Sequence, residues 1–370
     1  MSIKAIGHKI ILAAFLIIIC FSWLIWIFAA KYFDTTNHEN RELAVRPVLT
    51  LEEYKSYSHD YEAYFNDNIP FRNALISINS AVDFYAFNQS ADERVIVGED
   101  NWLFYASVAD GDPISCFKGT NLLSEEELRN IADNCVAQRD YLAEQGIEFV
   151  IFIAPNKERI YSEYMPKQYG EPAEMYAALQ IVEYLRNNTD LRIVYPYKEL
   201  IDAKNKLDEN IYYVTDTHWN NIGGYIGAAE LLKELNIDMP DICDDMLTIE
   251  KGENTAGDLA EMLNMNKYFE KNDIEYYVKG YDDHKIEIIN DDFNTTMVYH
   301  AKGADERKIY VYRDSFTSNM ASYIGSQFND TYMRYFGSYS YDDFLEQNPD
   351  IFVYETVERY VTGLGSFSIQ

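Results

Sequence analysis

Apolar strand-like runs and amphipathic helix-like segments alternate over residues 124–354, and this alternation is the strongest constraint on the fold of the chain. The capping-box sequence at Ser124 predicts a helix at 124–145. The continuous apolar run at 149–154 is typical of a strand that is buried on both faces. Alternation of this kind predicts an α/β fold in which helices flank a parallel sheet. Further helices are predicted at 173–187, 198–206, 220–235, 317–326 and 341–346, and further strands at 191–195, 211–214, 308–312, 332–336 and 351–354.

Two segments lie outside this regular pattern. Residues 51–87 have the helical spacing of aromatic and aliphatic side chains, which predicts a helical lead-in, and two short β-prone runs at 94–105 predict a hairpin. Residues 240–305 are more acidic and contain short alternating pieces, so we interpret them as an insertion in the domain.

An uncharged apolar stretch of 21 residues occupies positions 10–30 and is long enough to span a bilayer. Phe28 stands where a small residue should precede a signal-peptidase site, so we expect an uncleaved signal anchor. The predicted order is a cytoplasmic tail at 1–9, a single transmembrane segment, a linker at 31–50 and an extracytoplasmic domain at 51–370. The alternative is a cleaved signal peptide, although its apolar region is normally only about 7–15 residues long.

The charge and the cysteines limit the ligands that the chain can bind. With 31 basic and 61 acidic residues, the formal charge is −30. A field of that sign repels phosphates, which argues against nucleic acid and favours a neutral, zwitterionic or cationic external substrate. The alternative is that the charge serves solubility. Three cysteines lie outside the apolar stretch, and their spacing predicts neither a metal site nor a cofactor and leaves a Cys116–Cys135 disulfide open.

Polar residues follow three of the predicted strands. They are Asn156 and Lys157, then Asp216 and His218, and then Ser315. Catalytic groups in open α/β sheets collect at the carboxyl ends of the strands. A serine hydroxyl becomes a nucleophile when an imidazole takes its proton and a carboxylate orients that imidazole. Ser315 lies between a strand and a helix, as in a nucleophile elbow, where backbone N–H groups can hold an oxyanion.

These residues also have structural alternatives. Asp216, Thr217 and Ser315 can each cap the helix that follows them. Asn156 can shape a turn, and His218 can be a partly buried histidine without a catalytic role. His284 and His300 are the rival bases, and neither has surroundings comparable to those of His218.

Several segments, taken in order, resemble the alginate O-acetyltransferase family and the related DHHW proteins. They include Asp216-Thr-His-Trp219 and Asp314-Ser-Phe316, together with residues 61–72, 98–105, 154–157, 257–259 and 355–360. The resemblance covers about residues 50–362 and implies an SGNH-hydrolase-like, flavodoxin-like fold. It also implies a triad in which Ser315 is the nucleophile, His218 the general base and Asp216 the acid that orients it.

The resemblance implies an extracytoplasmic enzyme that attaches acetyl groups to an exported polysaccharide through an acetyl-serine intermediate. A membrane-bound O-acyltransferase is the implied source of acetyl groups. Two alternative functions stay open: a carbohydrate acetyl esterase, and a non-catalytic glycan-binding scaffold of an export complex. Arg313 stands where SGNH enzymes usually have glycine. The candidates for substrate binding or oxyanion stabilisation are Asn156, Lys157, Arg313, Glu355 and Arg359.

Overall fold

The computed structural model describes residues 9–13, 15–17, 42–50, 54–69, 72–281 and 283–370. Most of the predicted membrane segment at 10–30 and part of the predicted linker at 31–50 therefore lie outside the described residues. Among the helices that are described, none combines the length and the apolar character needed to cross a membrane.

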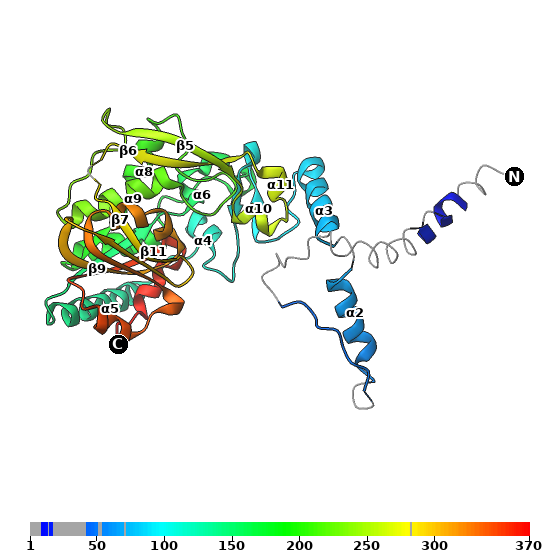
Figure 1. Cartoon of the computed structure of the whole chain (residues 1–370), viewed down its shortest axis with the longest axis horizontal. Coiled ribbons are helices and arrows are strands. Elements are labelled where there is room, and N and C mark those ends of the chain that lie inside the picture. Colours follow the sequence, from blue (N-terminus) through cyan, green and yellow to red (C-terminus); the bar gives the residue numbers. More distant parts are fainter. Residues whose placement is uncertain (1–8, 14, 18–41, 51–53, 70–71, 282) are drawn as a thin grey trace. The chain divides into compact units, whose positions relative to one another are not determined.

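The chain divides into two compact units. The first contains Met1–Ala91 and Glu261–Met265, and its helices α2 (Tyr57–Asp67) and α3 (Arg72–Phe87) correspond to the predicted lead-in (Figure 1). The second contains Asp92–Ala260 and Asn266–Gln370 and holds every candidate site residue.

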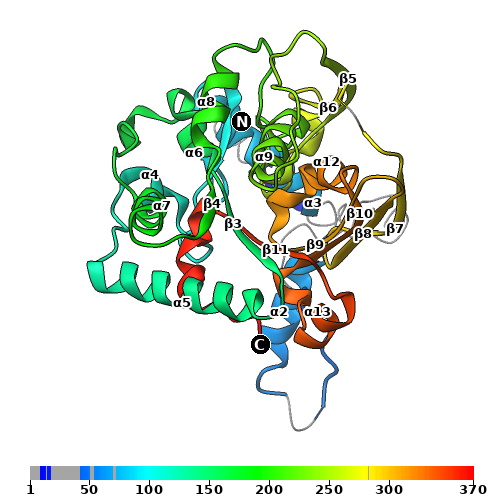
Figure 2. The same ribbon diagram turned by 90° about the vertical axis from the view of Figure 1, so that its left-hand side faces the viewer.

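A seven-stranded sheet in the order β4-β3-β11-β9-β10-β8-β7 forms the centre of the second unit (Figure 2). The first five strands in this order are parallel, as predicted, whereas β8 is antiparallel to β10 and β7 is antiparallel to β8. The prediction of a parallel sheet was wrong at this edge because short connections at 293–295 and 302–304 reverse the chain before and after β8, and a parallel pair needs a longer crossover. The strands are β3 (Glu148–Ala154), β4 (Arg192–Val194), β7 (Ile286–Asp292), β8 (Thr296–Ala301), β9 (Asp305–Arg313), β10 (Phe328–Tyr335) and β11 (Ile351–Val357).

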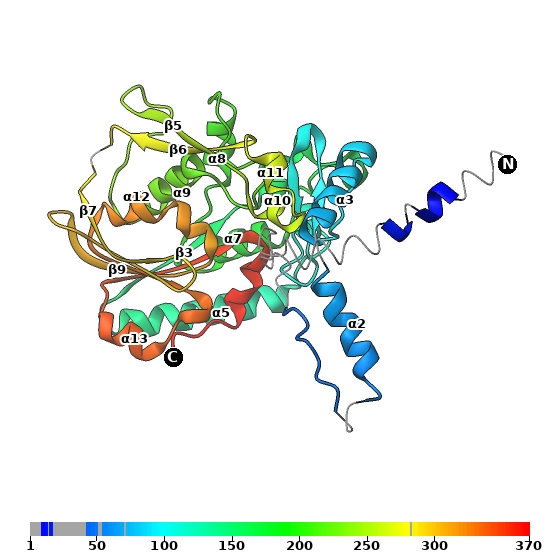
Figure 3. The same ribbon diagram turned by 45° about the vertical axis from the view of Figure 1, so that its right-hand side comes forward.

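Helices cover both faces of this sheet (Figures 2 and 3). Side chains of β9 alternate between the two cores, with Ile309 and Val311 in one and Tyr310 in the other, which explains the continuous apolar runs of the central strands. One face carries α8 (Tyr197–Lys204), α9 (Asn221–Glu234) and α12 (Ala321–Gly325), and the other carries α5 (Glu125–Ala143), α7 (Ala177–Asn188) and α13 (Tyr341–Gln347).

Shorter elements surround the sheet. The predicted hairpin is present as β1 (Val95–Val97) and β2 (Leu103–Tyr105), and the capping box at Ser124 is confirmed by its reciprocal bonds with Glu127. Cys116 and Cys135 are both free thiols. The remaining elements are β5 (Thr248–Thr255), β6 (Asp273–Lys279), α4 (Pro113–Lys118), α6 (Lys157–Ile160), α10 (Asp258–Met262) and α11 (Asn266–Phe269).

The predicted strand at 211–214 is wrong. This segment makes a single β-bridge, between Tyr212 and Trp219. Several backbone groups bond to side chains or to the hairpin instead: Asp273 accepts from the N–H groups of Val214 and of the following Thr215, and the carbonyl of Val214 accepts from Lys157 and from the N–H of Leu103. These groups are therefore satisfied without a strand ladder.

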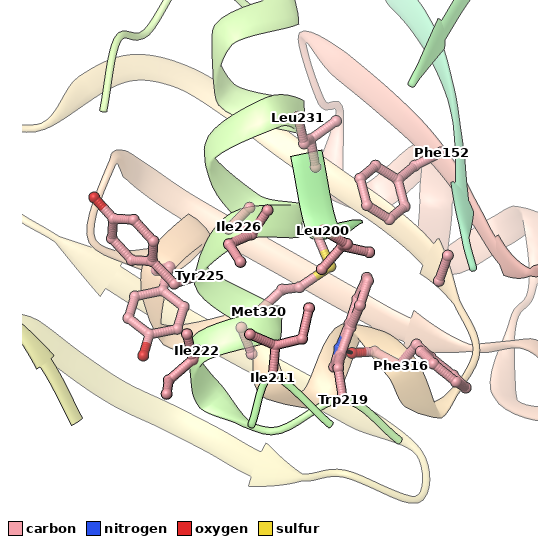
Figure 4. Close-up of a cluster of buried hydrophobic side chains, with 14 of the residues drawn as sticks. Phe152, Leu200, Ile211, Trp219, Ile222, Tyr225, Ile226, Leu231, Phe316 and Met320 are labelled. Atoms are coloured by element: carbon pink, nitrogen blue, oxygen red, sulfur yellow. Dashed lines mark hydrogen bonds between the residues drawn. The ribbon is translucent and has the colours of Figure 1, made fainter. Parts of the chain in front are cut away.

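Trp219 packs in the core beneath this segment (Figure 4). It is 0% exposed, and its ring lies 5.3 Å from the ring of Phe316. Its Nε1 donates to the carbonyl of Phe316 over 2.9 Å, and its own carbonyl accepts from Asn319. The residue after His218 is thus joined to the turn that contains Ser315, where a 3₁₀ turn (Ser315–Asn319) precedes α12 instead of the single predicted helix.

Candidate active site

Ser315, His218 and Asp216 lie in one hydrogen-bonded chain. His218 Nδ1 is 2.6 Å from Asp216 Oδ1, and His218 Nε2 is 2.7 Å from Ser315 Oγ. Because a carboxylate accepts at Nδ1, the neutral imidazole carries its proton there and turns the lone pair of Nε2 toward the serine hydroxyl. Ser315 therefore donates to His218, which is the arrangement needed to remove the hydroxyl proton.

Asp314 shapes the turn that presents Ser315. Its carboxylate caps the turn by accepting from the N–H of Phe316 over 2.8 Å, and it also accepts from the N–H of Val357 over 2.6 Å. In a nucleophile elbow the N–H that follows the serine stabilises the oxyanion. Here that N–H belongs to Phe316 and is already bonded to Asp314, so the predicted elbow geometry does not supply this donor.

Glu355 and Arg313 brace the same turn rather than facing a substrate. Glu355 is 1% exposed and accepts from the N–H of Asp314 over 2.9 Å and from Thr317 Oγ1 over 2.7 Å. Burial, and then the charge of Asp314, raises the pKa of Glu355 well above its usual value. Arg313 is fully buried and donates to the carbonyls of Asp314 and Phe293. Both were candidates for substrate binding, and the structure gives them positions beneath the turn.

Lys157 holds the segment that carries Asp216. It is 1% exposed, and its Nζ donates to the carbonyls of Leu103, Val214 and Asp216 over 2.6, 2.9 and 2.8 Å. Burial lowers the pKa of Lys157 to about 8, against the opposing effect of Asp273 and other carboxylates. The three N–H bonds of the ammonium are used by these carbonyls, so Lys157 has none left for the oxyanion that we had expected it to contact.

A second carboxylate, from Asp258, lies behind His218. Asp258 accepts from Thr217 N over 2.8 Å and from Thr217 Oγ1 over 2.6 Å, and its N–H donates to Asp216 Oδ2 over 2.9 Å. A Cβ on Gly257 would lie 2.2 Å from Asp216 Cβ, so only glycine permits this approach. Asp258 was not predicted as a site residue, because it is 42 residues away from Asp216 in the chain.

Asn156 and Arg359 are the remaining candidates. The side-chain amide of Asn156 is buried and makes no hydrogen bond within the described part of the chain, while its N–H donates to Glu358 over 3.1 Å. The guanidinium of Arg359 lies 5.8 Å from the ring of Phe316, next to Ser315. Asn156 and Arg359 are therefore better placed for substrate binding or oxyanion stabilisation than Lys157, Arg313 and Glu355 are.

Asp216, His218 and Asp258 also offer three ligand atoms within 4.8 Å of one another. Each already has a protein partner: His218 Nδ1 bonds Asp216, and both oxygens of Asp258 accept from Thr217. A metal ion here would have to displace these bonds. The arrangement is suited to proton transfer between Ser315 and His218.

Comparisons with known proteins place this site in context. The family model described as the SGNH hydrolase-like domain of the acetyltransferase AlgX matches residues 95–285. The chain is 26% identical over 211 residues to the probable alginate O-acetylase AlgJ of Pseudomonas putida, covering 56% of this chain and 51% of the relative. It is 23% identical over 224 residues to the AlgJ of Pseudomonas aeruginosa, covering 58% and 52%. The chain thus spans about half the length of the curated relatives it matches.

Solved structures share the fold. A DHHW family protein from Eubacterium siraeum superposes with a TM-score of 0.51 at 14% identity, covering 74% of this chain and 97% of that one. Bacillus cereus PatB1 with a sulfonyl adduct gives a TM-score of 0.51 at 14% identity, covering 73% and 97%. At this identity the likeness is one of fold.

Lys157→Met should lower the free energy of unfolding by about 3 kcal/mol or more, because it removes the buried ammonium that donates to the carbonyls of Leu103, Val214 and Asp216. Urea denaturation of the purified protein measures this change. The matched control is Lys233→Met, whose side chain is 65% exposed and whose effect should stay within about 0.5 kcal/mol. Unchanged stability of Lys157→Met would contradict the positioning role.

His218 should titrate with a midpoint above about 6.5, the ordinary value for histidine. Burial alone lowers the pKa of His218, but the carboxylate of Asp216 outweighs burial and raises it. NMR observation of the imidazole, assigned with His218→Gln, measures the midpoint, and Asp216→Asn should lower it. Because the folded protein binds this proton more tightly, the pair stabilises the fold below the unfolded pKa, and this contribution is lost as the pH rises through the folded value. A midpoint that Asp216→Asn leaves unchanged would contradict the coupling.

Proposed function

The chain belongs to the family of SGNH hydrolase-like acetyltransferase domains described for AlgX, and from that premise we propose that it is an O-acetyltransferase. Its proposed acceptor is a hydroxyl group of an exported or cell-surface polysaccharide. Its proposed location is the cell membrane, with residues 10–30 as a single-pass anchor and the second unit outside the cytoplasm.

One observation carries the proposal, namely the unbroken chain of hydrogen bonds from Ser315 Oγ through His218 to Asp216. A serine at the carboxyl end of a central strand, bonded to a neutral imidazole whose other nitrogen faces a carboxylate, has what an acyl-transfer nucleophile requires. Family membership supports acetyl as the acyl group.

In the first half of the reaction, His218 Nε2 takes the proton from Ser315 Oγ while Oγ attacks the carbonyl carbon of the acetyl donor. The tetrahedral intermediate collapses when the bond to the donor's leaving group breaks, and His218 returns the proton to that group. Acetyl-Ser315 remains. Asp216 stabilises the imidazolium in each step, and it can do so as an anion because the bond to His218 outweighs burial and lowers the pKa of Asp216 to about 2.

In the second half, a sugar hydroxyl gives its proton to His218 Nε2 and attacks the acetyl carbon. The bond to Ser315 Oγ breaks, and Oγ recovers the proton from His218. The products are the O-acetylated sugar and the free enzyme. If water takes the place of the sugar, the same steps give acetate, which is the reaction of the esterase alternative.

The donor and the acceptor are also proposals. We propose that a membrane-bound O-acyltransferase supplies the acetyl group outside the cytoplasm, as the family resemblance implies. The matched relatives are named as probable alginate O-acetylases, but the formal charge of −30 opposes a polyanionic acceptor. An uncharged or cationic polymer therefore fits this chain better.

Ser315→Ala should abolish the acetyl adduct and lower acetate release from a small acetyl ester by about 10⁴-fold or more, because the nucleophilic oxygen is removed. Intact mass spectrometry of the full chain in detergent detects the adduct, and released acetate gives the rate. Ser318→Ala, a serine of the same 3₁₀ turn with no bond to His218, is the control and should behave as wild type.

Adding an oligosaccharide acceptor separates the two enzymatic readings. A transferase should move label from acetyl-Ser315 to the sugar, whereas an esterase should release acetate at the same rate with or without it. Wild-type turnover by Ser315→Ala would overturn the nucleophile assignment, and a folded wild type that neither forms the adduct nor releases acetate would favour the scaffold reading.

A further inference from the structure

A pocket of ≈ 590 Å³ opens at the carboxyl ends of β9, β10 and β11, directly beside the turn of Ser315. This volume is in the usual range for small-molecule sites. Backbone and small polar side chains of residues 362–368 form part of its wall. Its aromatic lining consists of Tyr312, Tyr335, Phe336, Tyr354, Tyr360 and Phe367.

Several of these rings pack on one another and so have fixed positions. The centroids of Tyr312 and Phe336 are 4.5 Å apart with the rings stacked, and Tyr354 lies 5.3 Å from Tyr312 and 5.9 Å from Phe336. A ligand that packs on rings already held in place loses little affinity to side-chain ordering. The rings offer flat apolar surfaces that match the C–H face of a pyranose.

The same pocket also carries tyrosine hydroxyls that bond to none of the residues that the structure describes. The hydroxyls of Tyr312, Tyr335 and Tyr354 make no hydrogen bond to another group in the described part of the chain. By contrast, the hydroxyl of Tyr360 donates to Asp110. Three phenols that are free to donate and accept, set among apolar rings, suit a ligand with several hydroxyl groups.

The pocket is connected to the nucleophile through two of its lining residues. Asp314 immediately precedes Ser315, and the guanidinium of Arg359 lies 5.8 Å from the ring of Phe316, which immediately follows Ser315. Ser315 and His218 are not among the lining residues, so a sugar held in the pocket would contact Asp314 and Arg359, and an adjoining sugar of the same polymer would supply the hydroxyl that approaches the nucleophile.

The charges at the pocket favour an uncharged ligand. Arg359 and Asp314 bring one charge of each sign, and Asp314 and Glu158 both interact electrostatically with Arg359. A carboxylate on the ligand would therefore meet a cation that is already balanced, within a chain whose formal charge is −30.

We propose that this aromatic pocket binds an uncharged pyranose residue of the acceptor polysaccharide and presents it to Ser315. The inference rests on the proposed function for the identity of the ligand as acceptor. It adds a binding site and a substrate class to the proposed reaction, because the aromatic rings and phenols suit a pyranose, and the balanced charge of Arg359 within an acidic chain disfavours a uronate.

The test measures binding in the Ser315→Ala background, so that no turnover occurs. Saturation-transfer NMR and calorimetry with the full chain in detergent compare β-1,4-linked tetrasaccharides of glucose, mannose and mannuronate. We expect a neutral tetrasaccharide to bind more tightly than the mannuronate one. Phe336→Ala should weaken that binding about tenfold, because it removes a stacking surface. Tyr354→Phe, which keeps the ring, should weaken it about 2- to 10-fold through loss of the hydroxyl.

Tyr277→Ala is the control, since Tyr277 is 47% exposed on β6 and does not line the pocket. Circular dichroism checks that each variant is folded. The proposal is overturned if neither neutral tetrasaccharide binds, if mannuronate binds more tightly, or if Phe336→Ala and Tyr354→Phe both bind as the control does. Because binding needs no acetyl-serine, neutral-sugar binding through Phe336 would stand even if Ser315 formed no adduct, and that result would be a failure of the proposed function alone.

Discussion

A single buried ammonium holds together the part of the molecule on which the site depends. Lys157 leaves the carboxyl end of β3 and donates to a carbonyl of β2 and to two carbonyls of the segment that ends at His218. That segment makes only one β-bridge, so it has no ladder to fix it. Charged side chains hold it in position instead: Lys157 donates to its carbonyls, and Asp273 accepts from its N–H groups. Burying these charges costs solvation, and the cost is offset because each of them satisfies several backbone groups at once.

Charged side chains that bond to backbone groups also hold the turn of Ser315 in place. Glu355 and Asp314 accept from backbone N–H groups, and Arg313 donates to backbone carbonyls. Trp219 then joins the two parts, since its indole donates to the carbonyl of Phe316. The 2.7 Å contact between His218 and Ser315 is thus a contact between two independently braced loops. Rigid support on both sides is what fixes a hydrogen bond between residues 97 positions apart.

The sequence was informative where local pattern and structure coincide. A continuous apolar run predicted β3, because a strand buried on both faces needs no polar alternation. Ser315 was placed correctly at the carboxyl end of a strand, β9, whereas Asp216 and His218 were placed at the end of the predicted strand 211–214, which is not a strand in the structure. The failures at the site share one physical cause, which is that a buried charge finds its partners far along the chain. Lys157 bonds carbonyls 54, 57 and 59 residues away, and no spacing rule assigns such an ammonium to the backbone rather than to a substrate. The strand predicted at 211–214 failed for the same reason, since side chains replaced its ladder.

The surroundings of His218 balance two opposing requirements of a general base. Asp216 must stabilise the imidazolium, yet the imidazole must be neutral before it can accept a proton near neutral pH. Asp258 adds a second carboxylate 3.9 Å from Nδ1, which also favours the charged form, whereas burial and the nearby guanidinium of Arg359 disfavour it. Thr217 donates to both oxygens of Asp258 from N and Oγ1, which favours the Asp258 anion against burial and the charge of Asp216. Two acids therefore raise the pKa of His218, whereas burial and one cation lower it. That cation, Arg359, also lines the aromatic pocket, so a sugar bound there would lie next to one of the groups that set this pKa.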